Sequence, residues 1–249
     1  MAIVLDRLEK MDDGYLDISE LDLTELPKSP LWTEVIVLLC HDNKLSVLPN
    51  LPNIKKLYCH CNRLQSLPEL HDIETLICYD NQLTVLPELP LVKRLYCGYN
   101  QLTVLPDLPV VERLYCNHSQ LIALPKLPNI KVLWCNNNQL TVLPELPVLE
   151  ALWCSYNQLT VLPELPVVEG LQCDNNPLYY NTKFNKLHWM IINFITLKIY
   201  VTKWRKFNCK VVTAKKQDLH TELKYSPDLP FYKETEEYQH WLESTKSEY

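Results

Sequence analysis

The sequence predicts an α/β solenoid: about nine short strands form one parallel concave sheet, an extended backbone returns on the convex side, and small helices cap both ends. Two observations predict this fold. Cysteines recur every 19 residues, at positions 40, 59, 78, 97, 116, 135, 154 and 173. Around them runs the pattern L-x-C-x-x-N-x-L-x-x-L-P-x-L-P, complete in residues 95–109. Such a period indicates that one unit repeats and that successive units stack.

Each L-x-C segment predicts one short strand. Side chains two residues apart point the same way, so Leu and Cys enter the core while the residue between them faces solvent. A divergent ninth copy precedes the others, with Leu16 and Ile18 in the Leu and Cys positions. At about 4.8 Å per strand, nine strands make a sheet roughly 40 Å wide. The eight cysteines are therefore expected to be buried, reduced core residues.

The Asn of the pattern is predicted to turn inward and to hydrogen-bond free backbone groups of the bend, forming a ladder. Ser119 interrupts this ladder in one copy, and Leu21 does so in the first. Paired prolines such as Pro87 and Pro90 restrict φ and remove donors, which predicts an extended, polyproline-like return segment rather than a helix. His71 replaces the second proline in one copy.

With Cys in the third Leu position, the copies meet the pattern L-x-x-L-x-L-x-x-N/C-x-L, and residues 14–178 resemble the leucine-rich-repeat family. The segment N-Q-L-T-V-L-P-E-L-P, at 81–90 and 157–166, is similar to the short repeats of bacterial type III effectors and of repeat proteins of giant amoebal viruses. For an effector or a viral protein, the resemblance implies a location in the host cytosol.

Three segments are expected along the chain. Residues 1–13 form an N-terminal capping helix, since Ile3, Val4, Leu8 and Met11 are apolar at near-helical spacing. Residues 14–178 form the solenoid of about nine repeats. Residues 179–249 form a helical C-terminal cap and a tail, because a solenoid must cover its terminal core.

The residue between Leu and Cys forms a column on the predicted outer face of the sheet. Seven consecutive members are large and apolar, and we call them the aromatic stripe: Leu39, Tyr58, Ile77, Tyr96, Tyr115, Trp134 and Trp153. Solvent-facing strand positions are usually polar, so the stripe indicates either a binding surface or a stacking ladder that stiffens the sheet. Tyr and Trp dominate interface hot spots, which favours binding.

Mixed polar groups flank the stripe, as at the rim of a protein interface. The sequence therefore predicts a protein-binding module whose partner-binding residues are Tyr58, Tyr96, Tyr99, Tyr115, Trp134, Trp153, Tyr156, Arg94 and Arg113. An alternative is a structural component, for instance of a virus particle, whose copies meet through the stripe. Light scattering distinguishes the two, because only the second requires self-association.

No catalytic, metal or cofactor site is predicted. The effectors with similar repeats often carry a ligase domain with a catalytic C-x-D motif, whereas Cys209 is followed by Lys210 and Val211. Three histidines and one further cysteine lie beside the stripe, but they do not have a closed four-ligand zinc spacing and are interpreted as interface. They are His41, His60, Cys61 and His118.

The charge and hydropathy of the chain limit the classes of partner and the locations that can be expected. Residues 1–180 carry 12 Lys and Arg against 22 Asp and Glu, which argues against nucleic acid as the ligand. No secretory signal is visible at the N-terminus, so a cytoplasmic location is expected. The longest apolar stretch, 187–201, is short for a span of ~20 residues, so no transmembrane segment is predicted. The basic segment Tyr200 to Lys210 partly resembles an IQ motif and suggests a calmodulin-like partner; a basic amphipathic helix can alternatively lie on an anionic membrane surface.

Overall fold

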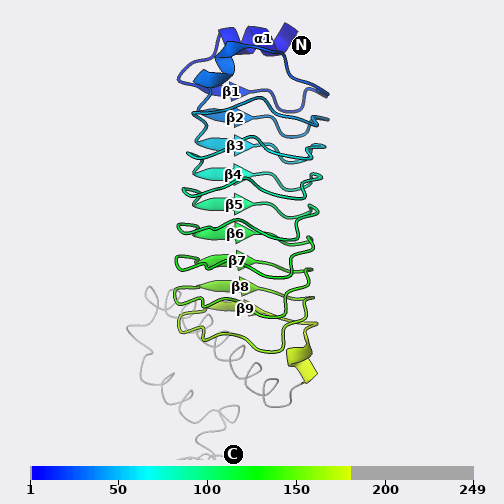
Figure 1. The fold of residues 1–249 in the computed structure, drawn as a ribbon, viewed down its shortest axis with the longest axis vertical. Helices are drawn as coiled ribbons and strands as arrows, with labels where there is room; N and C mark the ends of the chain where they lie inside the picture. The colour runs from blue at the N-terminus through cyan, green and yellow to red at the C-terminus, as the bar shows by residue number, and fades with distance from the viewer. Residues whose placement is uncertain (1, 181–249) are drawn as a thin grey trace, which may run out of the picture. The chain divides into compact units, whose positions relative to one another are not determined.

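The computed structural model describes residues 2–180, which form a single stack of coils along one parallel sheet (Figure 1). The sheet holds nine strands of three residues each, adjacent in chain order. They are β1 (Tyr15–Asp17), β2 (Val37–Leu39), β3 (Lys56–Tyr58), β4 (Thr75–Ile77), β5 (Arg94–Tyr96), β6 (Arg113–Tyr115), β7 (Val132–Trp134), β8 (Ala151–Trp153) and β9 (Gly170–Gln172). This arrangement confirms the predicted solenoid.

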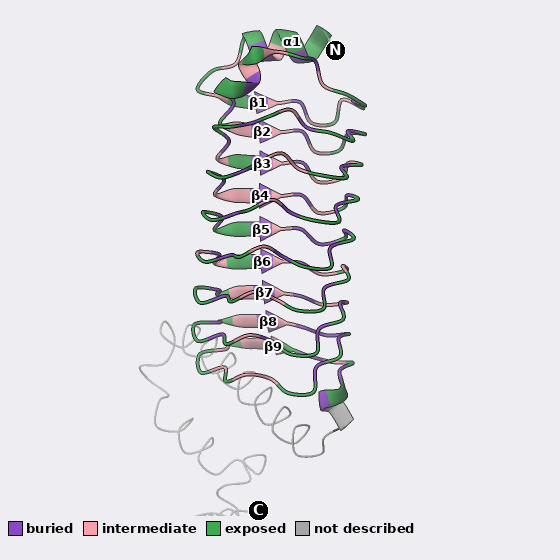
Figure 2. Cartoon of the chain, in the orientation of Figure 1, coloured by how far each residue is buried: buried purple, intermediate pink, exposed green. Residues whose placement is uncertain are grey.

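The strands pair in register, so every residue type of the repeat forms a straight column. Leu95 of β5 pairs with Leu114 of β6, and Tyr96 pairs with Tyr115. The core cysteine follows the strand and extends its hydrogen bonding, since the N–H of Cys97 donates to the carbonyl oxygen of Tyr115 at 2.8 Å. Figure 2 shows the consequence along the strands from β1 to β8: a buried centre between residues that are exposed or half-buried.

The core consists of stacked leucines and cysteines. All eight cysteines of the 19-residue period are fully buried, as the period predicts, and the seven from Cys40 to Cys154 carry free thiols. Burial raises the pKa of the Cys97 thiol to about 12 and that of Cys173 to about 12 as well. These thiols are therefore protonated core side chains.

The N-terminal end is covered by helix α1 (Ala2–Glu9). Val4 and Leu8 of this helix are buried against the first coil, whereas Ile3, which the spacing also assigned to the apolar face, is 47% exposed. The first coil is longer than the others: Asp17 pairs with Leu39, while later partners lie 19 residues apart. Its extra residues form the 3₁₀ helix η1 (Pro30–Glu34).

Between consecutive strands from β2 to β9, the return segments contain neither helix nor strand, as the paired prolines predict. The described part ends in the short 3₁₀ helix η2 (Pro177–Tyr180). The expected C-terminal helical cap and the IQ-like segment from Tyr200 to Lys210 lie outside the described residues. Within residues 2–180, no helix is long and apolar enough to span a membrane.

Candidate protein-binding face

The bend after each strand has one residue in the left-handed conformation, two positions beyond the core cysteine. Its φ lies between 51° and 56° in all eight regular coils. The occupants are Asp42, Cys61, Asp80, Tyr99, His118, Asn137, Tyr156 and Asn175. Asn and Asp tolerate this region, but for a bulky side chain it is strained. The column therefore holds Tyr99 and Tyr156 outward at a cost in backbone energy.

The inward-facing Asn holds each bend in place. In Asn100, Oδ1 accepts the N–H of Leu83 in the preceding coil at 2.9 Å. Its Nδ2 donates to the carbonyl oxygens of Cys78, Cys97 and Gly98 at 3.0 to 3.1 Å. Equivalent bonds run through the Asn residues of the other regular coils, which confirms the predicted ladder.

Ser119 is the exception that the sequence predicts. Its hydroxyl is buried and forms no hydrogen bond with any other described residue. The serine side chain is too short to reach the preceding coil. The hydrogen bonds that Asn100 makes between the coils of β4 and β5 therefore have no counterpart between the coils of β5 and β6. The ladder is therefore interrupted at this one boundary of the regular repeats.

The aromatic stripe is stacked and half-buried. Tyr96 and Tyr115 lie with ring centroids 4.3 Å apart and nearly parallel, and the Tyr115–Trp134 and Trp134–Trp153 centroids are each 4.9 Å apart with tilted planes. The sequence analysis placed these side chains in solvent. Instead, each ring covers its neighbours, because in-register strands are closer together than the rings are wide. Nε1 of Trp134 is buried without an acceptor among the described residues.

On one side of the stripe, Arg94 and Arg113 are exposed and adjacent in register. Neither guanidinium forms an ion pair within residues 2–180, whereas the column beside them is paired: Lys93 with Glu74, and Lys131 with Glu112. Both of these ion pairs have an N to O distance of 3.0 Å. Two positive charges thus remain available on the face.

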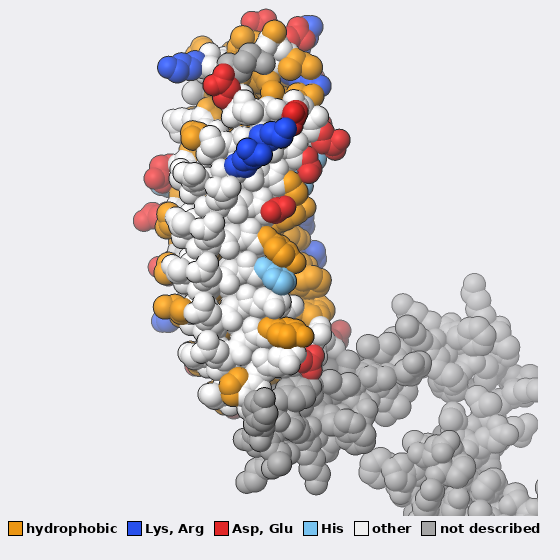
Figure 3. All heavy atoms as spheres, turned by 90° about the vertical axis from the view of Figure 1, so that its right-hand side faces the viewer, with side chains coloured by type: hydrophobic (Ala, Val, Ile, Leu, Met, Phe, Trp, Pro, Cys, Tyr) orange, Lys and Arg blue, Asp and Glu red, His pale blue; other side chains and the backbone are white. Residues whose placement is uncertain are grey.

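On the other side lie the bend residues Tyr99 and Tyr156, which are 53% and 57% exposed. His118 stacks on Tyr99 with centroids 4.3 Å apart. Figure 3 shows the molecule from the carboxyl ends of the strands, where apolar side chains gather along one edge. The structure therefore places Arg94 and Arg113 on one side of the half-buried stripe and exposed tyrosines on the other.

A second aromatic column, at the position after the core cysteine, occupies the N-terminal half of the sheet. His60 stacks between His41 and Tyr79, with centroid distances of 4.5 and 4.6 Å. Burial, reinforced by the nearby His41, lowers the pKa of His60. Asp42, which the sequence analysis did not single out, lies with its Oδ2 2.8 Å from Nδ1 of His41. That hydrogen bond keeps the pKa of Asp42 below its usual value.

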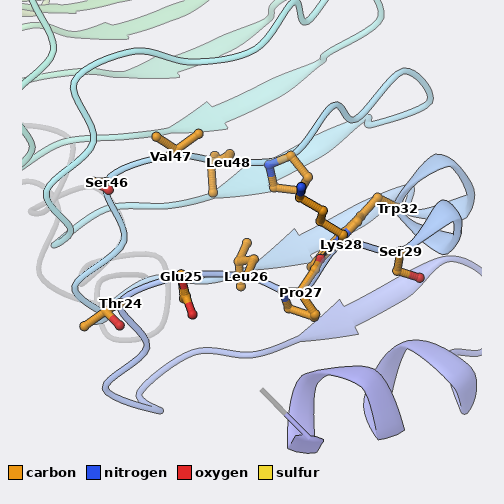
Figure 4. A pocket seen from close by; sticks show the side chains of 11 residues that line it. Thr24, Glu25, Leu26, Pro27, Lys28, Ser29, Trp32, Ser46, Val47 and Leu48 are labelled. Atoms are coloured by element: carbon orange, nitrogen blue, oxygen red, sulfur yellow. Dashed lines mark hydrogen bonds between the residues drawn. The ribbon is translucent and has the colours of Figure 1, made fainter.

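A hollow of about 450 Å³ opens between the first two coils, away from this face (Figure 4). Leu26 and Pro27 of the first coil and Val47 and Leu48 of the second contribute apolar side chains to it. Trp32 also lines it, with Nε1 donating to the carbonyl oxygen of Pro27 at 2.9 Å. None of the sequence-predicted partner-binding residues reaches this hollow.

No family model matches the sequence, and no curated protein matches it. Solved structures do. YopM of Yersinia pestis, described as a leucine-rich effector protein, is 30% identical with a TM-score of 0.59, over 70% of this chain and 59% of that chain. YopM of Yersinia enterocolitica is 28% identical with a TM-score of 0.55, over 70% and 49%. The functional domain of InlJ from Listeria monocytogenes, described as including a cysteine ladder, is 26% identical with a TM-score of 0.53, over 65% and 39%.

The chain thus spans less than two thirds of the length of these relatives. The likeness to repeats of giant amoebal viruses stays a prediction, since none of these structures is viral. Nevertheless, the stacked sheet, the cysteine column and the relatives agree with the repeat pattern of the sequence. The chain therefore folds as a leucine-rich-repeat solenoid, similar to these structures.

Proposed function

We propose that the chain is a non-catalytic module that binds a partner protein through the aromatic stripe and its two flanks. The main support is the exposure of the flanks: Arg94 and Arg113 are exposed and form no ion pair within residues 2–180, and Tyr99 and Tyr156 are more than half exposed. An apolar centre beside charged and aromatic side chains has the composition of a protein interface.

The side chains of the two flanks indicate which groups the partner surface carries. Two adjacent guanidinium groups favour carboxylates, which they bind in a bidentate manner. The stacked rings between these groups and the exposed tyrosines favour apolar side chains. The partner surface is therefore an acidic segment with large apolar residues, held in the cytosol where the core thiols stay reduced.

The left-handed strain at Tyr156 and Tyr99 also supports this proposal. Asn occupies the same position at Asn137 and Asn175 without such strain. Tyrosine at this position lowers stability without adding core contacts, which is expected where the side chain serves binding.

The test uses two double variants of the full chain. Each variant is compared with the wild type first in whether it captures a partner protein and then in its affinity for that partner, which a titration measures. Tyr99→Asn with Tyr156→Asn removes the exposed rings and keeps the backbone conformation. The control, Val104→Ser with Val142→Ser, removes two side chains that are 55% and 54% exposed on the return side. Ser is native to that position at Ser66.

The proposal expects the same protein to be captured by the wild type and the valine control, and its affinity to fall about tenfold or more in the tyrosine variant. Arg94→Thr with Arg113→Thr should lower the affinity as well, and Thr75 shows that Thr fits the column. Equal affinity of all four proteins contradicts the proposal. Self-association of the wild type that the tyrosine variant abolishes favours the structural alternative instead.

A further inference from the structure

The bends after β2 and β3 bring together three side chains that can ligate a metal. His41 and His60 follow the core cysteines of adjacent strands, so the register places their rings 4.5 Å apart and within 10° of parallel. Asp42 is the left-handed residue of the same bend, and its carboxylate faces His41. One donor atom from each of the three lies within 4.8 Å of the other two.

The donor set has the chemistry of a transition-metal site. Two imidazole nitrogens and one carboxylate oxygen suit Zn²⁺ and its neighbours, whereas Mg²⁺ and Ca²⁺ prefer oxygen alone. Zinc commonly takes three protein ligands and leaves a fourth position open. With metal–donor distances of about 2.0–2.1 Å, donors on a tetrahedral ion stand about 3.3 Å apart, so the two rings must turn out of their parallel stack until a nitrogen of each points at the ion.

One imidazole nitrogen of this cluster of residues is without a partner in the described part of the chain. Nδ1 of His60 is buried and has no hydrogen-bond partner among the described residues. A buried polar atom is normally satisfied, so an unpartnered imidazole nitrogen beside a carboxylate requires an explanation. A bound cation supplies one.

A second histidine on the same face provides the contrast. His118 occupies the left-handed position of its bend, where it stacks on Tyr99 and lies 3.2 Å from the side-chain amide of Asn137. No carboxylate and no second histidine cluster with it within residues 2–180. The grouping of ligands is therefore specific to the bends after β2 and β3.

We propose that His41, His60 and Asp42 bind a divalent transition-metal ion of the zinc class. The thiol of Cys61 lies close to the carboxylates of Asp42 and Asp80. The ion bridges the coils of β2 and β3 at the edge of the binding face. This site is independent of the proposed partner and of the aromatic stripe.

The experiment titrates Zn²⁺ into the reduced full chain by calorimetry, for the wild type and three variants. His41→Asn and His60→Asn each remove one ligand, and Asn occupies the equivalent position at Asn117 and Asn136. His118→Asn is the matched control, because it removes a stacked histidine outside the cluster.

The wild type and His118→Asn should bind zinc alike, and His41→Asn and His60→Asn should bind it about tenfold or more weakly at this site. Zinc should raise the melting temperature of the first pair only. Zinc bound elsewhere in the chain contributes equally to all four proteins and cancels. Equal zinc binding by wild type and His60→Asn, or an equal loss in His118→Asn, overturns the proposal.

Discussion

Nδ2 of Asn100 lies 3.0 Å from the carbonyl oxygen of Cys78, one coil back along the chain. The same amide nitrogen also donates to the carbonyl oxygens of Cys97 and Gly98 in its own bend. One side chain therefore satisfies backbone groups of two coils at once. This relationship makes the asparagine both a bend residue and a connection between repeats.

Asn100→Ala should lower the free energy of unfolding by about 1–3 kcal/mol, because it leaves buried backbone groups without partners. Ser119→Asn should raise it by about 1 kcal/mol, because it restores the missing connection. Urea denaturation measures both changes. A loss below about 0.3 kcal/mol in Asn100→Ala contradicts a stabilising role for the ladder.

Tyr156→Asn should stabilise the chain by up to about 1 kcal/mol, since Asn is less strained than Tyr at a φ of 56°. Tyr156→Val should destabilise it, because a β-branched residue is the least suited to this region. Thermal unfolding of the two variants beside the wild type tests the order. If both variants melt at the wild-type temperature, the left-handed position carries no strain.

Trp134→Tyr should leave stability within about 0.5 kcal/mol of the wild type, since Tyr96 on Tyr115 already shows a tyrosine stack and the lost indole N–H has no acceptor. Trp134→Ser should cost about 1–2 kcal/mol, because two half-buried ring contacts are lost. Denaturant midpoints compare them. Equal stability of the serine variant and the wild type shows that the stack does not contribute to folding.

Alkaline pH should destabilise the fold through the core thiols. Their pKa values lie above the ordinary 9.0 in the folded chain, so their contribution to stability is complete below pH 9 and declines above it, as thiols of the unfolded chain ionise. Each thiol contributes a slope of about 1.4 kcal/mol per pH unit. The raised pKa values of Tyr79 and Tyr115 act in the same direction.

Urea unfolding of the reduced protein at pH 7 to 10 measures this slope. In the variant with Cys97→Ala and Cys135→Ala, the free energy of unfolding should fall less steeply with pH, by the contribution of the two removed thiols. The variant should nevertheless be less stable than the wild type at pH 7. A parallel pH profile for variant and wild type excludes the thiols as the cause.

The 19-residue period was sufficient to predict the strands, the buried cysteines, the asparagine ladder and its interruption at Ser119, because each depends on a repeated local pattern. The half-burial of the aromatic stripe was missed, since side-chain alternation describes one strand and not the overlap of rings between strands. The approach of Asp42 to His41 and His60 was missed for a related reason. It depends on the left-handed bend, which a sequence pattern of non-glycine residues does not reveal.

Ser119 also bears on how the solenoid comes apart. In a repeat protein each coil contacts only its neighbours. The free energy needed to detach a coil therefore depends on its contacts with the adjacent coil. The boundary between the coils of β5 and β6 has no asparagine bridge, so we expect it to be the weakest boundary of the regular repeats. Fraying from the carboxyl end should therefore pause once it has crossed Ser119, with the coils of β1 to β5 still folded. The protein then behaves as two cooperative blocks, and the stripe divides between Tyr96 and Tyr115.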